Sequence, residues 1–331
     1  SNANRNFKKY KFNFHFFIIK FFLMFIFYKA NRYGEYGNDT PAHLLMFLLI
    51  SEIIKNINKV NSEKFFNLVL ISIFIIMNKI ILLLSIFYPL VFFFSNKLKL
   101  KIFTIKNTFI LLFVFIWFVK NIIVSGCLLY PVGITCISNL KWVDEKEARI
   151  VSIENEAWAK GWPDYKKNNS NFSQDEYSKK FNWFETWSKN HLKKIIKIFF
   201  PYLILIIILP LILLKKINLP KYNREFNYLL IVTLAGCLMW FLKVPVFRYG
   251  YSYLIIFISL IIGWIYSFFI FKENLKIVFK VSIVILFTIF SAKNLNRIIF
   301  EDKKYYNYPW PKYHSMGGKN NIIEHEFEFI N

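Results

Sequence analysis

The short segment NRYGEYGNDTPAH, Asn31 to His43, gathers side chains that could do chemistry. It places two carboxylates, Glu35 and Asp39, beside Arg32 and His43, directly after the first long apolar run of the chain. Ionisable residues at a membrane edge are costly unless they line a wet cavity, so such a group indicates a functional site. We therefore predict a site at this segment, with Arg32 and His43 among its substrate contacts.

Each carboxylate also has a structural interpretation. Asp39-Thr40-Pro41 suits the start of a helix, because Asp or Thr caps the exposed amides and Pro is preorganised for the first turn. Glu35 can be a solvated loop acid or an ion-pair partner of Arg32. Both interpretations stay open beside the functional one. The stretch from His43 to Ile57 is too short to span, and its pattern predicts a helix lying along the membrane interface.

The composition is that of a multi-pass membrane protein. Of the 331 residues, 56% are hydrophobic and 40 are Phe, and the apolar runs are too long and too numerous for a soluble core. The net charge of +23 does not indicate nucleic acid, because the Lys residues form short blocks between apolar runs instead of one basic face. We expect an all-α fold, a multi-pass transmembrane helical bundle surrounded by membrane lipid, with no nucleic-acid partner.

About seven spans are predicted, with one ambiguity. The second run covers about 30 residues, or about 45 Å of helix against about 30 Å of hydrocarbon, and Met77-Asn78-Lys79 interrupts it. It is either one tilted helix or two short arms of a re-entrant hairpin, and the hairpin would invert everything downstream. The spans are Phe12 to Tyr28, Phe65 to Phe94, Asn107 to Val124, Ile195 to Leu214, Phe226 to Leu242, Tyr251 to Phe271 and Ile277 to Ser291.

Blocks of Lys and Arg set the orientation, because positive residues favour the cytoplasmic side. Such blocks precede the first run, follow the second and follow the fourth, and all three are cytoplasmic if the second run crosses once. The candidate chemistry then collects on the external face of a bacterial inner membrane. The expected regions are a membrane region 1–123 with a polar external loop 30–43 and an interfacial helix 43–57, an external loop 124–194, a bundle 195–292 and an external tail 293–331.

The long external loop offers further candidates. Cys127 and Cys136 are either a disulfide in an oxidising compartment or two unpaired thiols. Trp142 and four later Trp residues suit either an interfacial aromatic belt or platforms on which sugars stack. Lys193 and Lys194, at the end of the loop, lie close to one helical face. They either snorkel toward lipid headgroups or contact the phosphate of a lipid-linked donor.

The turn KVPVFRYGYSYL places Arg248 between aromatic residues at a membrane edge. A guanidinium can hold a phosphate through two parallel hydrogen bonds while Tyr249 and Tyr251 flank it, or it can anchor a helix at the interface. No compact group of His, Asp and Glu demands a metal, so no metal ligand is predicted. A divalent metal stays open as an assistant, and no other cofactor is expected.

Together these features resemble the GT-C superfamily of integral membrane glycosyltransferases, and more closely poorly characterised bacterial membrane proteins encoded with envelope polysaccharide genes. The likeness rests on the acid-bearing loop after a transmembrane helix, the adjacent interfacial helix, the Gly-Cys-Leu-Leu-Tyr-Pro turn with a downstream Trp, and the Pro-x-x-Arg-Tyr turn. It implies a polyprenyl-phosphate-linked sugar donor and an envelope glycan or lipid acceptor. It also implies that Asp39, or failing it Glu35, is the catalytic base and that Arg248 contacts the donor phosphate.

Two other functions stay open. A flippase or other transporter of lipid-linked saccharides would bind the same lipid, but transporters place ionisable residues at the bilayer midplane, whereas this chain has them at span ends. A non-catalytic membrane subunit is the second alternative. Because Ser1-Asn2-Ala3 is typical of the scar left after removal of an expression tag, we also keep open that the chain is part of a longer protein.

Overall fold

The structure is a computed structural model, and it describes residues 2–29, 39–57, 61–95, 104–168, 171–212, 214–217, 224–267, 269–271, 275–296 and 299. Within these ranges the regular secondary structure is helical apart from one short ribbon, in which β1 (Leu214–Ile217) pairs antiparallel with β2 (Phe269–Phe271). The expected helical class is therefore confirmed. The predicted tail lies outside the described residues from position 300 onward.

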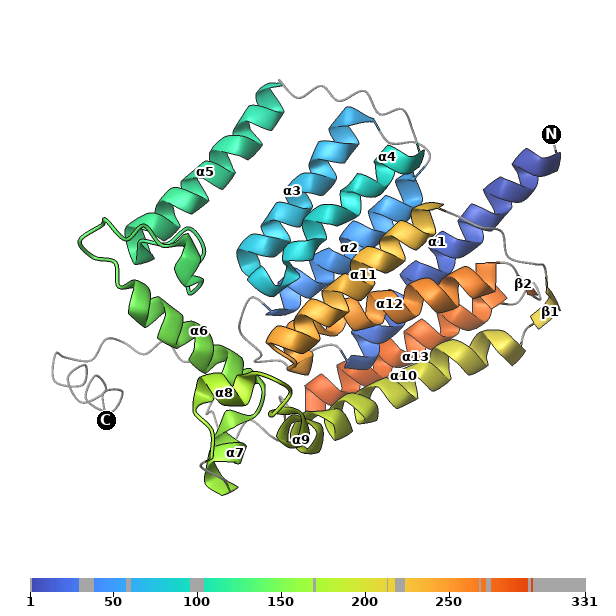
Figure 1. Cartoon of the computed structure of the whole chain (residues 1–331). Helices are drawn as coiled ribbons and strands as arrows, with labels where there is room; N and C mark the ends of the chain where they lie inside the picture. Colours follow the sequence, from blue (N-terminus) through green and yellow to red (C-terminus); the bar gives the residue numbers. More distant parts are fainter. Residues whose placement is uncertain are drawn as a thin grey trace.

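The long helices pack side by side into a bundle (Figure 1). α1 (Asn2–Lys29) lies against α12 (Phe247–Ser267) and α13 (Leu275–Asn296), and α12 also contacts α11 (Arg224–Lys243). Aromatic rings fill these contacts, as expected for a chain so rich in Phe. On the outside of the bundle α10 (Lys193–Ile212) is tied to α1 by a hydrogen bond from its Tyr hydroxyl to a backbone carbonyl of α1.

The ambiguous second run is a hairpin. α3 (Ser62–Asn78) ends at Lys79, whose backbone is extended, and the chain then returns as η1 (Ile80–Val91) and the short helix α4 (Phe92–Ser95). The two arms lie side by side (Figure 1), and the Phe65 and Phe93 rings at their far ends are 5.5 Å apart. The single tilted helix on which the orientation was argued is therefore wrong. The break falls where an Asn-Lys pair would otherwise lie in the middle of a long apolar helix.

The expected interfacial helix over 43–57 is instead part of the bundle. α2 (Asp39–Asn56) packs against α1, α3 and α12 and buries most of its length. Two polar residues in its second half are satisfied within the helix, since Ser51 donates to the Phe47 carbonyl and Asn56 donates to Glu52. This local pairing lets a helix with polar positions lie inside the bundle, and it explains why polarity alone misplaced α2.

The hairpin and the inclusion of α2 in the bundle each reverse the direction of the chain once. Together they leave the expected orientation of the later helices unchanged. α2 begins where Asp39 meets Lys79 and Arg248, and it ends where Asn56 accepts a hydrogen bond from Lys64 at the start of α3. The start of α2, the hairpin tip and the start of α12 therefore lie at one end of the bundle, which we call the site end. The start of α3 lies at the opposite end.

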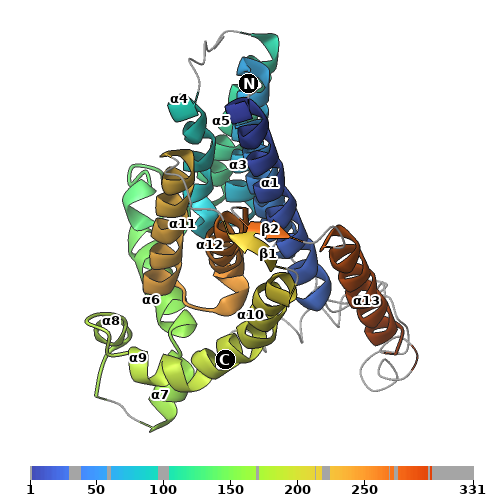
Figure 2. The same ribbon diagram turned by 90° about the vertical axis from the view of Figure 1, so that its right-hand side faces the viewer.

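Four helices in the described part of the chain are long and apolar enough to cross a membrane. The prediction of seven spans is not confirmed, and two further apolar helices in the described residues, Phe14–Tyr28 and Ile80–Val91, are shorter. α13 and α5 (Ile105–Ser125) lie at the edges of the bundle (Figures 1 and 2), and their apolar side chains are largely exposed, as lipid contact requires. The four segments are Asn107–Ser125, Arg224–Lys243, Phe247–Tyr266 and Ile277–Asn296.

Residues 126–192, which we call the loop subdomain, form small helices beside the site end (Figure 1). The described helices here are η2 (Gly133–Thr135), α6 (Glu145–Ala159), α7 (Trp162–Asn168), α8 (Gln174–Ser178), α9 (Phe184–Trp187) and η3 (Ser188–Leu192). Trp183 and Trp187 form part of its core, with 2% and 4% exposure, so they are neither belt residues nor open platforms for sugars. The subdomain is fastened to the turn after α11, because the Trp187 indole donates to the Pro245 carbonyl at 2.7 Å.

Candidate functional site

The candidate site is an acid held between two cations at the site end. The Asp39 carboxylate, in the first turn of α2, pairs through Oδ1 with Nζ of Lys79 at the hairpin tip. Its second oxygen, Oδ2, lies 3.9 Å from Nε of Arg248 in the first turn of α12. Three elements that are distant in sequence therefore converge on one carboxylate. We refer to Asp39, Lys79, Arg248 and Tyr249 as the Asp39 cluster.

Tyr249 fixes the spacing of the two cations. Its ring centroid is 3.9 Å from Nζ of Lys79 and 4.8 Å from Cζ of Arg248. A guanidinium nitrogen of Arg248 also donates to the Tyr249 hydroxyl at 2.7 Å. Cations are attracted to the electron-rich faces of aromatic rings, so one ring stabilises both positive groups.

His43 joins α2 to α12 beneath the cluster. Its Nε2 lies 2.9 Å from the Arg248 carbonyl oxygen and its Nδ1 lies 2.7 Å from Oγ of Ser252. A carbonyl only accepts, so Nε2 carries the proton and the Ser252 hydroxyl donates to Nδ1. Both nitrogens are occupied and the side chain is buried, so His43 is a positioning residue rather than the predicted substrate contact.

Two further contacts set the start of α12, and with it Arg248. The Trp240 indole on α11 donates to the Val246 carbonyl at 2.9 Å, and its ring packs directly on Gly250. The Tyr251 ring lies 3.9 Å from the His43 ring, centroid to centroid. Tyr251, predicted to flank a bound phosphate, therefore packs against the histidine that joins α2 and α12.

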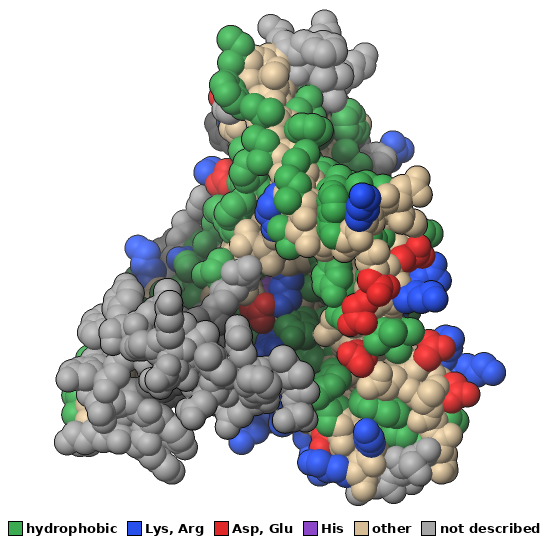
Figure 3. Space-filling view, turned by 90° about the vertical axis from the view of Figure 1, so that its left-hand side faces the viewer, with side chains coloured by type: hydrophobic (Ala, Val, Ile, Leu, Met, Phe, Trp, Pro, Cys, Tyr) green, Lys and Arg blue, Asp and Glu red, His purple; other side chains and the backbone are tan. Residues whose placement is uncertain are grey.

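Solvent exposure increases across the cluster from Lys79 to Arg248. The Lys79 side chain is 12% exposed, the Asp39 side chain 35% and the Arg248 side chain 68%. Burial lowers the pKa of Lys79, and its contacts with Asp39 oppose that shift. Figure 3, which views the molecule from the left-hand side of Figure 1, shows acidic and basic side chains together in a recess. The site is therefore accessible from the Arg248 side.

The described donor set of the cluster does not suit a divalent metal. Hard cations prefer several oxygen ligands, whereas Asp39 is the one carboxylate among the described residues of the cluster and stands between two positive groups. In the described ranges no three His, Cys, Asp or Glu residues form a group that could hold a metal. The chemistry that the cluster offers is anion binding by Lys79 and Arg248 beside a carboxylate able to take a proton.

The predicted site is assembled in part. The structure brings together Asp39, His43, Arg248, Tyr249 and Tyr251, which lie in two segments of the chain. Glu35 and Arg32 fall outside the described residues.

Two residues of the site were missed by the sequence reasoning, Lys79 and Ser252. A signal for Lys79 existed, since a lysine inside a long apolar run needs a partner. Ser252 had none, because its role follows only from the position of His43.

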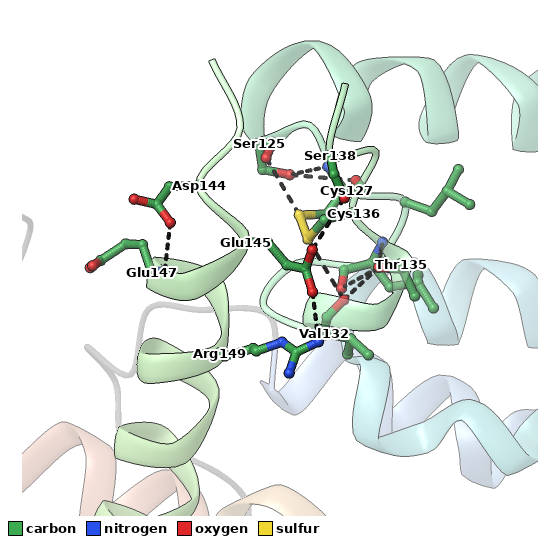
Figure 4. The surroundings of a disulfide bond; sticks show 12 residues. Ser125, Cys127, Val132, Thr135, Cys136, Ser138, Asp144, Glu145, Glu147 and Arg149 are labelled. Carbon is green, nitrogen blue, oxygen red and sulfur yellow. Dashed lines mark hydrogen bonds and ion pairs between the residues drawn. A yellow bond between two sulfur atoms is a disulfide. The ribbon is translucent and has the colours of Figure 1, made fainter. Parts of the chain in front are cut away.

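The remaining candidates lie elsewhere. Trp142 is exposed in the loop subdomain and donates to the Ile122 carbonyl at 3.2 Å. Lys193 and Lys194 begin α10 with exposed side chains, and in the described part of the chain neither contacts the Asp39 cluster. Cys127 and Cys136 form a disulfide that closes the first loop of the subdomain, beside the start of α6 (Figure 4).

Comparisons with curated proteins and with solved structures found no match. A family model, described as a domain of unknown function (DUF8201), matches residues 2–255, which include the whole Asp39 cluster and the loop subdomain. Because the match covers most of the chain, the protein belongs to the DUF8201 family.

Proposed function

We propose that this protein is a membrane glycosyltransferase that moves a sugar from a polyprenyl-phosphate-linked donor to an envelope glycan or lipid acceptor. The observation that carries the proposal is the Asp39 cluster itself, in which an acid and two cations meet at one end of an apolar helical bundle. A lipid-linked donor needs a phosphate-binding site at the membrane surface, and its sugar needs a nearby base. The cluster offers both.

The reaction is a displacement at the anomeric carbon. The acceptor hydroxyl oxygen forms a bond to that carbon, and the bond from carbon to the phosphate oxygen breaks. Asp39 takes the hydroxyl proton, and the departing lipid phosphate keeps the bonding electron pair. Arg248, the more open cation, stabilises the negative charge that develops on the phosphate.

We further propose that the site end faces the outside of a bacterial inner membrane. The support is the distribution of basic blocks in the sequence, since they follow the hairpin and α10, which both end at the opposite end of the bundle from Asp39 (Figure 1). The loop subdomain, which carries the disulfide, is fastened to the site end. A disulfide is compatible with an oxidising compartment on that side.

The test is sugar transfer in membranes that contain the full chain and a polyprenyl-phosphate-linked sugar. We expect Asp39→Asn to lower the rate roughly 10²- to 10⁴-fold, the range of a lost general base. Arg248→Gln should also lower it. The matched control is Glu52→Gln, an acid on the same helix near the opposite end of the bundle. Glu35→Gln is measured in parallel, because sequence reasoning offers Glu35 as the alternative base. Unchanged transfer by Asp39→Asn would overturn the assignment of Asp39.

A carrier of the same lipid is the second candidate. It is favoured by one observation, that Asp39 is already engaged by Lys79 and must leave that contact before it can take a proton. The transfer assay separates the two functions. A carrier would move the labelled donor across sealed vesicles without forming a glycosylated acceptor.

A further inference from the structure

We propose that Asp39 occupies the place of a lipid phosphate between Lys79 and Arg248, and that the incoming phosphate displaces it. Lys79 is then a second phosphate-binding residue, which the sequence did not suggest. The inference rests on the proposed function for its ligand class, a phosphate ester on a membrane lipid. It adds an exchange of partners that the proposed function does not require.

The geometry of the ligand-free cluster supports the exchange. Each oxygen of the Asp39 carboxylate faces a different cation, Oδ1 toward Lys79 and Oδ2 toward Arg248 at 3.9 Å. A phosphate group has the same charge sign and presents several oxygens, so it can bridge the same two cations. The Arg248 side chain is 68% exposed, so a ligand can approach the cluster from that side.

Helix ends add to the attraction that the two cations exert on an anion. The first turns of α2 and α12 carry Asp39 and Arg248, and helix N-termini carry partial positive charge. Lys79, Arg248 and these two helix starts therefore all favour an anion at the position that Asp39 occupies.

The hairpin places Lys79 at its tip, beside Tyr249 and Arg248. The chain interrupts an apolar run of helix to put this lysine at the tip, where its backbone is extended and its side chain is mostly buried. Tyr249 then holds Lys79 and Arg248 against one ring. Since this ring, and not Asp39 alone, fixes the two cations, they keep their spacing when the carboxylate leaves. The exchange also frees Asp39 to take a proton, so phosphate binding prepares the base.

The experiment measures binding of a short-chain prenyl phosphate without a sugar to the detergent-solubilised full chain. Asp39→Asn removes the competing carboxylate without changing its shape, so we expect binding to become about tenfold tighter, about 1.4 kcal/mol. Lys79→Met should weaken binding roughly 10- to 100-fold, and Lys79→Arg should retain it. Lys189→Met is the control, an exposed lysine of the loop subdomain that should have no effect. Inorganic phosphate is the second probe, and it shows whether the headgroup alone is recognised.

The exchange is refuted if Asp39→Asn binds the prenyl phosphate no more tightly than the native chain. It is also refuted if Lys79→Met binds as well as Lys79→Arg. The melting temperature of each unliganded variant is recorded, and the comparison between Lys79→Met and Lys79→Arg decides the matter if Asp39→Asn does not fold. Failure of the proposed function gives a different result. A chain that binds prenyl phosphate by exchange but transfers no sugar would keep this binding site, and the glycosyltransferase proposal alone would fail.

Discussion

Gly250 is the position where one added methyl group should disturb the site without touching a charge. It lies in the first turns of α12, two residues after Arg248. A Cβ atom at Gly250 would lie 2.1 Å from Cδ1 and 2.2 Å from Cγ of Trp240. The Trp240 side chain is 4% exposed and its indole donates to the Val246 carbonyl. A rigid, buried indole cannot yield by a small rotation, so Gly250→Ala must move either the ring or the helix.

The expected cost follows from these contacts. Overpacking a tight contact costs about 1–3 kcal/mol, and loss of the bond from the Trp240 indole to the Val246 carbonyl adds about 1 kcal/mol. Alanine in place of glycine in a helix returns about 1 kcal/mol. We therefore expect Gly250→Ala to lower the free energy of unfolding by about 1–3 kcal/mol, the balance of these terms.

A matched control lies on the same helix. A Cβ atom at Gly263 would lie 3.0 Å from Cδ1 of Ile18, the mobile end of a flexible side chain, so Gly263→Ala should be close to neutral. The assay is thermal melting of the full chain in one detergent, together with prenyl phosphate binding. Gly250→Ala should weaken binding because it displaces the turn that carries Arg248. Equal stability of the two variants would refute the reasoning.

Two other perturbations give clear expectations. His43→Phe removes the two hydrogen bonds that join α2 to α12 and should lower the melting temperature, because it leaves the Ser252 hydroxyl and the Arg248 carbonyl without this partner. An unchanged melting temperature would contradict the role of His43. Trp187→Phe removes the bond to the Pro245 carbonyl and should cost about 1 kcal/mol. Protease cleavage of the loop subdomain should become faster, whereas the exposed Trp158→Phe should leave it unchanged.

The sequence predicted the meeting of Asp39 and Arg248 for an incomplete reason. The basic blocks predicted that the two residues lie on the same face of the membrane. That prediction assumed that 65–94 is a single span and that 43–57 lies outside the bundle. Each assumption was wrong, and because each error reverses the orientation once, the common face remained. Periodicity cannot separate one long tilted helix from two short arms, since both present the same apolar residues. The contact between the arms decides it.

The roles within the site were harder to predict than its location. Lys79 looked like an interruption in an apolar run, and its partner lies 40 positions away at Asp39. His43 was predicted to contact substrate because the sequence shows that it is polar but does not show that it is buried. The contacts that occupy it come from Ser252 and a backbone carbonyl on α12, and a sequence pattern does not show a contact of that range.

A shared site requires the hairpin tip to lie on the same side of the membrane as Arg248, and thiol labelling measures this directly. Cysteine is introduced in place of Asn78, next to Lys79, in a chain that carries Cys237→Ala, while the native disulfide stays intact. A reagent that cannot cross the membrane is applied to intact cells, with Arg248→Cys measured alongside. We predict that both positions are labelled from outside. Labelling of Asn78→Cys only after the cells are opened, with Arg248→Cys labelled from outside, would contradict a shared site.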